Sequence, residues 1–594
     1  EAACPNLLRS GPLRRKIRWC YNLVRFYIGV LTMTQKYKWE YPGLICICAV
    51  YLGLTLYRLI ELPGEWYGDI SIEHQAVTAI LSGHWPWQFN LSAGPAYHYI
   101  VAAFAYFLGA NYATYKLASV VTGLAAIILT YLLGKEFGGA RVGLFAALAG
   151  AVSFWLILFA RLGSSPQILS PVLGAGTVYF LLRFSRTRRW YDVAFSMVFA
   201  GWGLFTYPST FVLPIILLAL ILWQLISTRD RAHWRRALAV AIVVLLPFAI
   251  GFGLTINTNS AFTQGGYVAS KIAGQNASPM EMALTFSKNM VKALGMFQVK
   301  GDPAFRTNVP GSPALDPLSG VLMDLGLLWL LVSQRLRRRW GYVIVPFIIL
   351  LMPSAAPGIL PGEIPSASRA LGVAPFAFLL VGLGVEAVWT AAPGLLASKS
   401  RLASHLPRLT RSHPGSSDLE PSIPMTGGSL ISPAAARARW ISGILVGLAL
   451  GAIGYLNVDH YFGDYAAQLP GHNQPWNQVI AQYIETLPAQ TTVRMVTCCW
   501  QDTEQPSLQA IGYQLEGMKP QATLDTKAYL KSCEALTPGK SYVVILPPKE
   551  DSIWVRKLRD CFPYSARQMH YDGIGQATFF TLAIDLRQGS EALP

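Results

Sequence analysis

The residues best suited to chemistry stand in one acidic stretch near the start of the chain, PGEWYGDISIEHQAVTAILSGHWPW. It contains Glu65, Asp69, Glu73 and His74 and no Lys or Arg. If residues 69–82 form a helix, Asp69 and Glu73 stand four residues apart and share one face. Two carboxylates placed in this way can deprotonate a hydroxyl group or position a sugar. Alternatively, they belong to a solvated loop in which Asp69 stabilises the start of a helix.

Three further segments place charged residues beside apolar runs. GDPAFRTNVPGSPALDP contains Asp302 and Arg306, PGEIPSASRALGVAP contains Glu363 and Arg369, and FARLGSSPQ contains Arg161. A planar guanidinium can bind a phosphate through two parallel hydrogen bonds. The same arginines could instead extend towards lipid headgroups. Because the neighbouring segments carry so little charge, we favour a binding site.

The sequence shows no pattern for a metal or a nucleotide. The nine His residues are scattered, and the spacing of the eight Cys residues fits no zinc site. A Walker loop is also missing from the sequence, which argues against an ATP-driven transporter. We therefore expect a site that requires no metal and no other cofactor.

The elements that must position these residues are membrane-spanning helices. Of the 594 residues, 53% are hydrophobic and only 13% are charged, whereas soluble chains average about 25% charged. Uncharged runs such as residues 117–134 and 237–256 match the roughly 30 Å hydrocarbon core of a bilayer. The fold class expected is a polytopic α-helical membrane protein.

The charge pattern predicts eleven spans and their orientation. Despite a net charge of +17, the Lys and Arg residues gather between the spans, at 183–189, 229–236 and 335–339. This distribution is typical of cytoplasmic loops and not of a nucleic-acid-binding surface. With the N-terminus in the cytoplasm, the long outer loops are 62–113, 258–316 and 356–369. The predicted spans are 42–61, 114–134, 142–160, 168–184, 191–206, 209–227, 237–257, 317–333, 341–355, 370–393 and 440–458.

Three segments of the membrane region are not predicted to span. Residues 96–109 are short and aromatic, and we expect a helix in the outer interface or re-entering it. Residues 1–40 form a basic cytoplasmic segment, in which residues 14–33 could lie on the membrane as an interfacial helix. Residues 394–439, rich in Ser, Pro, Ala and Arg, are predicted to be a disordered cytoplasmic linker.

Residues 459–594 predict a small α/β domain on the outer face. An amphipathic helix is expected in PWNQVIAQYIETLPA, and strands in TTVRMVTCCW, SYVVILPP and ATFFTLAIDL. Cys498, Cys499, Cys533 and Cys561 lie in this domain. An oxidising compartment would permit a disulfide, for which Cys533–Cys561 is one candidate, and buried thiols are the alternative.

The order of these features resembles the GT-C superfamily of membrane glycosyltransferases, in particular the protein O-mannosyltransferase and aminoarabinose transferase group. The resemblance covers roughly residues 45–390 and excludes the linker and the C-terminal domain. It is carried by the acidic loop, then SAGPAYHYIVAAFAYFLGANYATYKLASVVTGLAAIILTYLLGKEFGG, FARLG, GLFTYPST, MFQVKGDPAFRTNVPGSPALDP and IPSASRALGVAP.

The resemblance implies an inverting enzyme that moves a sugar from a polyprenyl-phosphate carrier to an acceptor at the outer membrane face. Asp69 would be the catalytic base, and Arg369, with Arg161 or Arg306, would neutralise the departing phosphate. Where the family usually has Asp followed by Glu, Ile70 follows Asp69 here. Glu73, one helical turn later, could substitute for that Glu. The remaining predicted binding residues are His74, Asp302 and Glu363.

Two other functions remain open. The chain could be a non-catalytic GT-C-like subunit of a larger membrane complex, which the presence of Ile70 favours. It could also transport a lipid-linked glycan, although we find no internal repeat and most charged residues lie towards the ends of the spans. The expected partners are membrane lipids, a lipid-linked sugar donor and a protein, lipid or glycan acceptor. The expected location is the plasma membrane.

Overall fold

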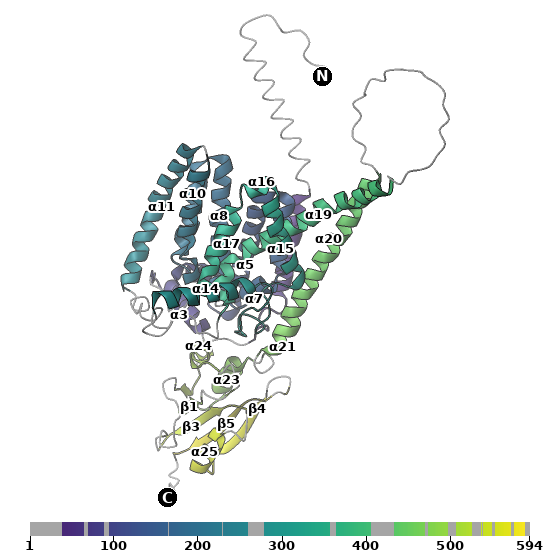
Figure 1. The fold of residues 1–594 in the computed structure, drawn as a ribbon. Coiled ribbons are helices and arrows are strands. Elements are labelled where there is room, and N and C mark those ends of the chain that lie inside the picture. The colour runs from purple at the N-terminus through teal and green to yellow at the C-terminus, as the bar shows by residue number, and fades with distance from the viewer. Residues whose placement is uncertain are drawn as a thin grey trace, which may run out of the picture.

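The protein consists of a bundle of apolar helices and a smaller sheet domain that lies beyond one end of the bundle (Figure 1). The computed structural model describes residues 39–64, 69–87, 94–163, 165–228, 230–258, 278–356, 364–404 and 433–469, and in the C-terminal region 473, 475–496, 500, 506–518, 520–525, 536, 539–548, 553–571, 575 and 577–587.

Helices occupy all eleven predicted spans. Six of the described helices are long and apolar enough to cross a membrane, or seven if the pair α6–α7, bent by 56°, forms one span. The chain is therefore a helical membrane protein, and the count of eleven crossings stays a prediction. The helices in the predicted spans are α2 (Glu40–Leu56), α5 (Tyr112–Gly138), α6 (Ala140–Val152), α7 (Phe154–Arg161), α8 (Leu169–Thr187), α9 (Trp190–Gly203), α10 (Leu213–Ser227), α11 (Arg231–Thr258), α15 (Pro317–Val332), α17 (Gly341–Ala355), α19 (Ala374–Ser404) and α20 (Pro433–Asp459).

Glycine allows two helices of the bundle to approach closely. A Cβ atom at Gly326 in α15 would collide with the carbonyl of Leu380 in α19, and one at Gly384 would collide with the carbonyl of Leu322. Small residues at such crossings let the backbones pack against each other, which drives helix association inside a membrane. This contact fixes α19 against α15.

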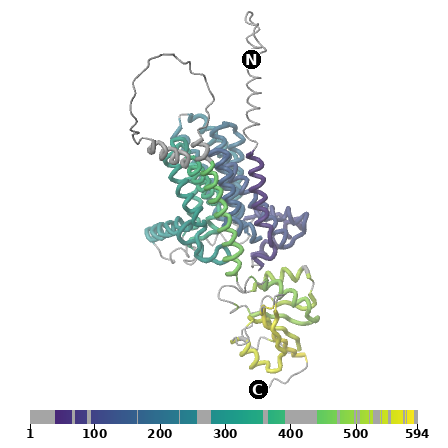
Figure 2. The backbone as a smooth tube through the Cα atoms, turned by 90° about the vertical axis from the view of Figure 1, so that its right-hand side faces the viewer, coloured from purple at the N-terminus to yellow at the C-terminus, as the bar shows by residue number. Residues whose placement is uncertain are grey.

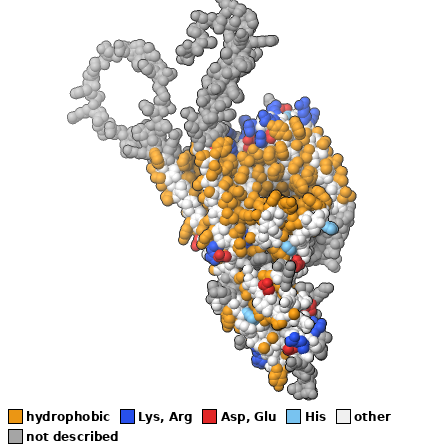
Figure 3. Space-filling view, turned by 180° about the vertical axis from the view of Figure 1, so that it is seen from behind, with side chains coloured by type: hydrophobic (Ala, Val, Ile, Leu, Met, Phe, Trp, Pro, Cys, Tyr) orange, Lys and Arg blue, Asp and Glu red, His pale blue; other side chains and the backbone are white. Residues whose placement is uncertain are grey.

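The two ends of the bundle differ in charge. The space-filling view shows Lys and Arg side chains gathered at the end away from the sheet domain, with a broad hydrophobic band below them (Figure 3). In α11, for example, Ile242, Val243 and Ile250 are exposed, as expected for side chains that face lipid. We call the opposite end, which faces the C-terminal domain, the domain end.

Three helices outside the predicted spans belong to the domain end: α3 (Asp69–Leu81), α4 (Pro95–Leu108) and α14 (Pro279–Gly295). The first shows that the helix considered for residues 69–82 forms, and the second confirms the helix expected at 96–109. The third was not predicted, although Ser278 and Glu281 form a capping box at its start, which is a recognisable sequence pattern.

The C-terminal domain contains a five-stranded mixed sheet with the order β2-β1-β3-β5-β4. Strand β1 pairs in parallel with β2 and β3, whereas β5 pairs antiparallel with β3 and β4. This confirms the three predicted strands and the predicted helix α23. The tube view shows this domain as a separate body continuing from the last long helix (Figure 2). Its elements are β1 (Thr491–Met495), β2 (Thr523–Leu524), β3 (Ser541–Leu546), β4 (Ala566–Tyr571), β5 (Ala577–Asp585), α23 (Trp476–Glu485), α24 (Leu508–Met518) and α25 (Ile553–Cys561).

Several predictions concern segments that the structure describes only in part or not at all. Residues 1–38 and 405–432 lie outside, while α19 and α20 extend into both ends of the predicted linker. Cys561 is disulfide-bonded. Its predicted partner Cys533 lies outside the described residues, so the pairing stays a prediction.

Candidate functional site

Asp69 is the first residue of α3, and its side chain is exposed. The positive end of the helix dipole lies beside this carboxylate. Residues 65–68, including Glu65, lie outside the described part of the chain. Asp69 therefore offers an accessible acceptor for a proton at the domain end.

Glu73, one turn further along α3, has a different environment. Its residue is only 2% exposed, and both carboxylate oxygens lie 3.0 Å from Nδ1 of His98 in α4. The two carboxylates predicted on one face of a helix are thus not equivalent. Asp69 faces solvent, whereas Glu73 joins α3 to α4.

The pairing with Glu73 changes the pKa of His98. Burial disfavours its charged form, but the charge of Glu73 and the hydrogen bond between them outweigh burial and raise the pKa of His98 above its usual value of 6.5. The His98–Glu73 pair is thus a buried, hydrogen-bonded contact between α3 and α4. It locks the helix that carries Asp69 to its neighbour.

We predict that this pair makes stability depend on pH. Because the pKa of His98 is raised by folding, its contribution is complete below pH 6.5 and is lost as the pH rises through the folded value. Glu73→Gln should lower stability at pH 6 by about 3 kcal/mol, since it leaves a buried cation unpaired. The check is the thermal midpoint of the purified protein between pH 6 and pH 9.

The matched control for this prediction is Glu485→Gln at an exposed position of α23. It should leave both the midpoint and its pH profile unchanged. A Glu73→Gln variant with the stability and pH profile of the native protein would show that the pair stabilises nothing.

His74 lies where the C-terminal domain meets α3. Its Nδ1 atom is 2.6 Å from the Tyr115 hydroxyl, and its ring packs against that of Tyr513 in α24, with the centroids 3.8 Å apart and the planes tilted by 33°. Its Nε2 atom is 3.8 Å from Glu516. Burial lowers the pKa of His74 despite Glu516, so the ring is mainly neutral at neutral pH.

Asp302 joins two of the predicted charged segments. This residue is 3% exposed, and its carboxylate accepts hydrogen bonds from the Thr307 hydroxyl (3.1 Å) and the Ala367 backbone N–H (2.6 Å). Ala367 begins the short helix α18 (Ala367–Ala370), which contains Arg369. Asp302 thus holds the loop of Arg306 against the helix of Arg369.

Arg161 does not share this environment. Its side chain is fully buried. It donates to Tyr461 and to the carbonyls that end α2 and begin the following loop, those of Leu54, Thr55, Arg58 and Leu62. All five guanidinium N–H groups are used in this way, so the observed arrangement offers none to a phosphate.

The elements of the site form a connected series. The start of α4 is hydrogen-bonded to the turn that follows α9. The Gly94 N–H donates to the Thr206 carbonyl, and the Ala96 N–H donates to the Phe205 carbonyl. The next residues along the chain, the turn Pro208–Thr210, contact α18. Within the described residues, the helices of Asp69 and Arg369 are thus linked through α4 and this turn. Glu363 lies outside the described residues.

Several residues of the site were not predicted from the sequence, namely His98, Tyr115, Tyr461, Asn473, Tyr513 and Glu516. His98 carried a usable signal, because a histidine inside the apolar segment AYHYIVAAF calls for a buried partner. The other five gave none, since their partners are distant in the sequence. Among the described residues, no group of three or more His, Cys, Asp or Glu side chains could hold a metal ion.

One protein-family model matches part of the chain. Residues 92–250 match the model of the family described as dolichyl-phosphate-mannose-protein mannosyltransferase. No curated protein matches the chain.

Three solved structures match the chain at low sequence identity. ArnT from Cupriavidus metallidurans bound to undecaprenyl phosphate is 12% identical, with 93% of this chain and 99% of that chain covered and a TM-score of 0.47. The oligosaccharyltransferase of Archaeoglobus fulgidus in its apo form is 13% identical, covering 92% and 74%, with a TM-score of 0.48. The Pmt1-Pmt2 protein O-mannosyltransferase complex of S. cerevisiae with its sugar donor is 15% identical, covering 38% and 33%, with a TM-score of 0.31.

The family match covers α4 to α11 and includes His98. It begins 23 residues after Asp69, so it contains the helix to which α3 is locked. Residues 92–250 are similar to the dolichyl-phosphate-mannose-protein mannosyltransferases, which confirms the predicted resemblance of the chain to the GT-C membrane glycosyltransferases.

Proposed function

We propose that the protein is an inverting glycosyltransferase that moves a sugar from a polyprenyl-phosphate carrier to an acceptor at the outer face of the membrane. The observation that carries this proposal is the exposed carboxylate of Asp69 on a helix locked by a buried ion pair to the family-matching region. An accessible base on a rigid support is what a single displacement at a sugar carbon requires.

In this mechanism the acceptor hydroxyl attacks the anomeric carbon from the side opposite the phosphate. A bond forms between the acceptor oxygen and that carbon, and the bond from the carbon to the phosphate oxygen breaks. The acceptor proton passes to Asp69. One displacement inverts the configuration at the anomeric carbon, and the polyprenyl phosphate leaves with its negative charge.

The leaving phosphate needs positive charge close by. Arg369 and Arg306 are the cations proposed for this role, because Asp302 holds their two segments together. Stabilisation of charge that develops in the transition state is commonly the largest single contribution to catalysis. The proposal uses neither a metal ion nor another cofactor, and it assigns no ligand contact to Arg161.

The membrane orientation belongs to the same proposal. The basic end of the bundle would face the cytoplasm of a cell whose plasma membrane the chain spans eleven times. The domain end, with Asp69 and the C-terminal domain, would face outwards. A carrier with a long polyprenyl chain could then reach the site from within the bilayer.

The test is transfer of radiolabelled sugars from polyprenyl-phosphate donors by the full chain in proteoliposomes. The proposal expects labelled acceptor product with the opposite anomeric configuration to the donor. Retention of configuration would exclude the single displacement. If folded protein turned over no donor, the proposed glycosyltransferase activity would be excluded.

Arg369 gives a second prediction for the same assay. Arg369→Gln should lower kcat/KM for the donor by about a hundredfold, because charge at the leaving group is removed. The control is Arg335→Gln at an exposed position of the basic end, which should leave kcat/KM unchanged. If Arg369→Gln kept the native kcat/KM, Arg369 would not stabilise the leaving phosphate.

One observation favours a second candidate function, that of a non-catalytic subunit of a membrane complex. Ile70 is 1% exposed, and Glu73 is tied to His98, so neither can act beside Asp69 as the family's Glu would. A subunit of this kind would co-purify with its partners in fixed stoichiometry and show no transfer.

A further inference from the structure

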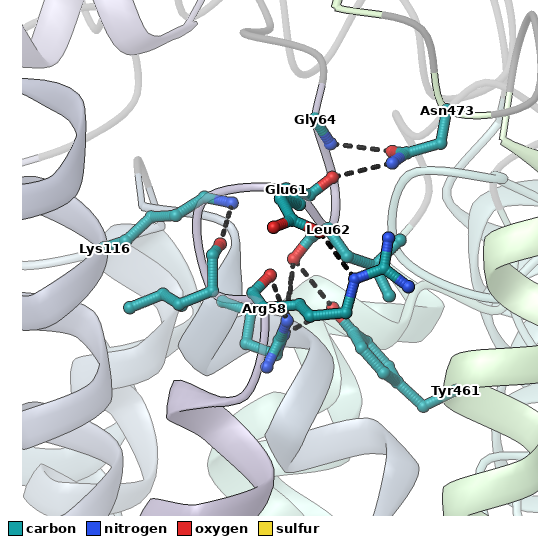
Figure 4. A network of polar contacts seen from close by, with 9 residues as sticks. Arg58, Glu61, Leu62, Gly64, Lys116, Tyr461 and Asn473 are labelled. Carbon is teal, nitrogen blue, oxygen red and sulfur yellow. Dashed lines mark hydrogen bonds and ion pairs between the residues drawn. The ribbon is translucent and has the colours of Figure 1, made fainter. Parts of the chain in front are cut away.

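The loop between α2 and α3 is held from the far end of the sequence. Asn473, which follows the last long helix, contacts this loop twice (Figure 4). Its Oδ1 atom accepts the Gly64 backbone N–H at 2.7 Å, and its Nδ2 atom donates to the Glu61 carbonyl at 2.6 Å. One amide side chain therefore satisfies a donor and an acceptor only three residues apart.

Tyr461, in the turn that continues α20, approaches the same loop. Its ring is fully buried, and its hydroxyl donates to the Leu62 carbonyl at 3.4 Å while accepting from Arg161 at 2.8 Å. Figure 4 shows Tyr461 and Asn473 approaching the loop from one side and Lys116 from the other. The loop that leads to Asp69 is thus fixed by the segment that leads to the C-terminal domain.

A second contact from the same domain reaches α3 itself. Helix α24 packs on α3, where the ring of Tyr513 lies tilted against His74 and Glu516 faces the Nε2 atom of His74. The Tyr513 hydroxyl also donates to the Ala110 carbonyl at 3.5 Å, which precedes α5. The contact with His74 therefore lies five residues after Asp69, and the contacts of Asn473 lie five and eight residues before it.

We infer that the C-terminal region positions the catalytic helix by holding it on both sides of Asp69, at residues 61–64 through Asn473 and at His74 through Tyr513. We call these two contacts the bracket. The inference rests on the proposed function and deepens it, because it makes Asn473 and Tyr513 positioning residues for the reaction of Asp69. A base displaced by about 1 Å can lose a hundredfold in rate.

The side-chain geometry allows a clean set of variants. Asn473 has a left-handed backbone with φ of 68°, so Asn473→Gly removes the amide while keeping a conformation that glycine adopts freely. Asn473→Asp retains the acceptor for Gly64 and loses the donor to Glu61. Tyr513→Ala removes the ring, whereas Tyr513→Phe retains it.

The matched controls are Gln468→Gly and Gln509→Ala. Gln468 is exposed in the same connecting segment, and Gln509 is exposed on α24. Neither belongs to the bracket, so both controls should behave as the native protein does.

The first readout is hydrogen–deuterium exchange over residues 58–81 in the full chain. Asn473→Gly and Tyr513→Ala should each raise exchange there, with Asn473→Asp and Tyr513→Phe intermediate or unchanged. The second readout is sugar transfer, where kcat should fall by about tenfold to a hundredfold. KM for the donor should stay within twofold, because the donor does not contact the bracket.

Native exchange over residues 58–81 in Asn473→Gly and Tyr513→Ala would overturn the inference. Raised exchange with an unchanged kcat would overturn it too, because a bracket that positions the base must affect turnover. If the native chain transfers no sugar, the proposed function fails separately. The exchange experiment then still decides whether the bracket holds α3.

Discussion

Replacing Asp69 with Asn is expected to lower kcat for sugar transfer by about a hundredfold to ten-thousandfold, the usual contribution of a general base. The amide keeps the shape of the side chain but cannot take the acceptor proton. Because Asp69 is exposed at a helix start, the variant should fold and bind donor as the native protein does. The measurement is single-turnover transfer from a polyprenyl-phosphate donor in proteoliposomes.

Two further variants make this result specific. Asp69→Glu should recover part of the activity, since it restores a carboxylate on a side chain that is longer by one methylene group. Asp560→Asn, the same change at an exposed position of α25, should have no effect. If Asp69→Asn turned over at the native rate, another group would have to be the base, and the proposed mechanism would be wrong.

Arg161→Met is expected to destabilise the protein by about 3–5 kcal/mol, the largest effect on stability that we predict. The side chain satisfies four backbone carbonyls and Tyr461 in a fully buried place. Its removal leaves the Leu54 and Thr55 carbonyls without their side-chain donor, each at a cost of about 1–3 kcal/mol before the loop relaxes. The other two carbonyls keep one hydrogen bond each, from the Leu62 N–H and the Tyr461 hydroxyl. Arg161→Lys should recover only part of the loss, because an ammonium has three donors and a guanidinium five.

The thermal midpoint and the donor KM separate this role from phosphate binding. The structural role predicts a lower midpoint and, in protein that remains folded, a KM for the donor close to the native value. Arg556→Met at an exposed position of α25 is the control and should leave both unchanged. A raised donor KM with a native midpoint would instead return Arg161 to the carrier site.

The helices could be predicted from the sequence because each span is a long uncharged run whose length is set by the membrane. The helix of Asp69 and the strands of the C-terminal domain followed from periodicity in the same way. Strand β4 was missed because most of its residues are exposed at the edge of the sheet, so it shows no apolar alternation. Helix α14 was missed although its capping box was present in the sequence.

The site was less predictable because its key contacts join distant residues. Asp69 and Glu73 were correctly placed on one helix, but nothing in their spacing shows that His98 buries one of them and not the other. Likewise, the sequence placed Arg161 at the end of a span without indicating whether it pointed inwards. Contacts across 409 residues, such as that between Gly64 and Asn473, leave no local pattern.

That last contact has a consequence for how the protein is made. Gly64 leaves the ribosome long before Asn473, and at ~5–20 residues per second the 409 intervening residues take roughly 20–80 s to synthesise. During that interval the loop ahead of Asp69 lacks the amide that later joins its N–H and carbonyl groups. A nascent chain therefore carries its proposed base early but acquires the complete support for it only after Asn473 and Tyr513 have been synthesised.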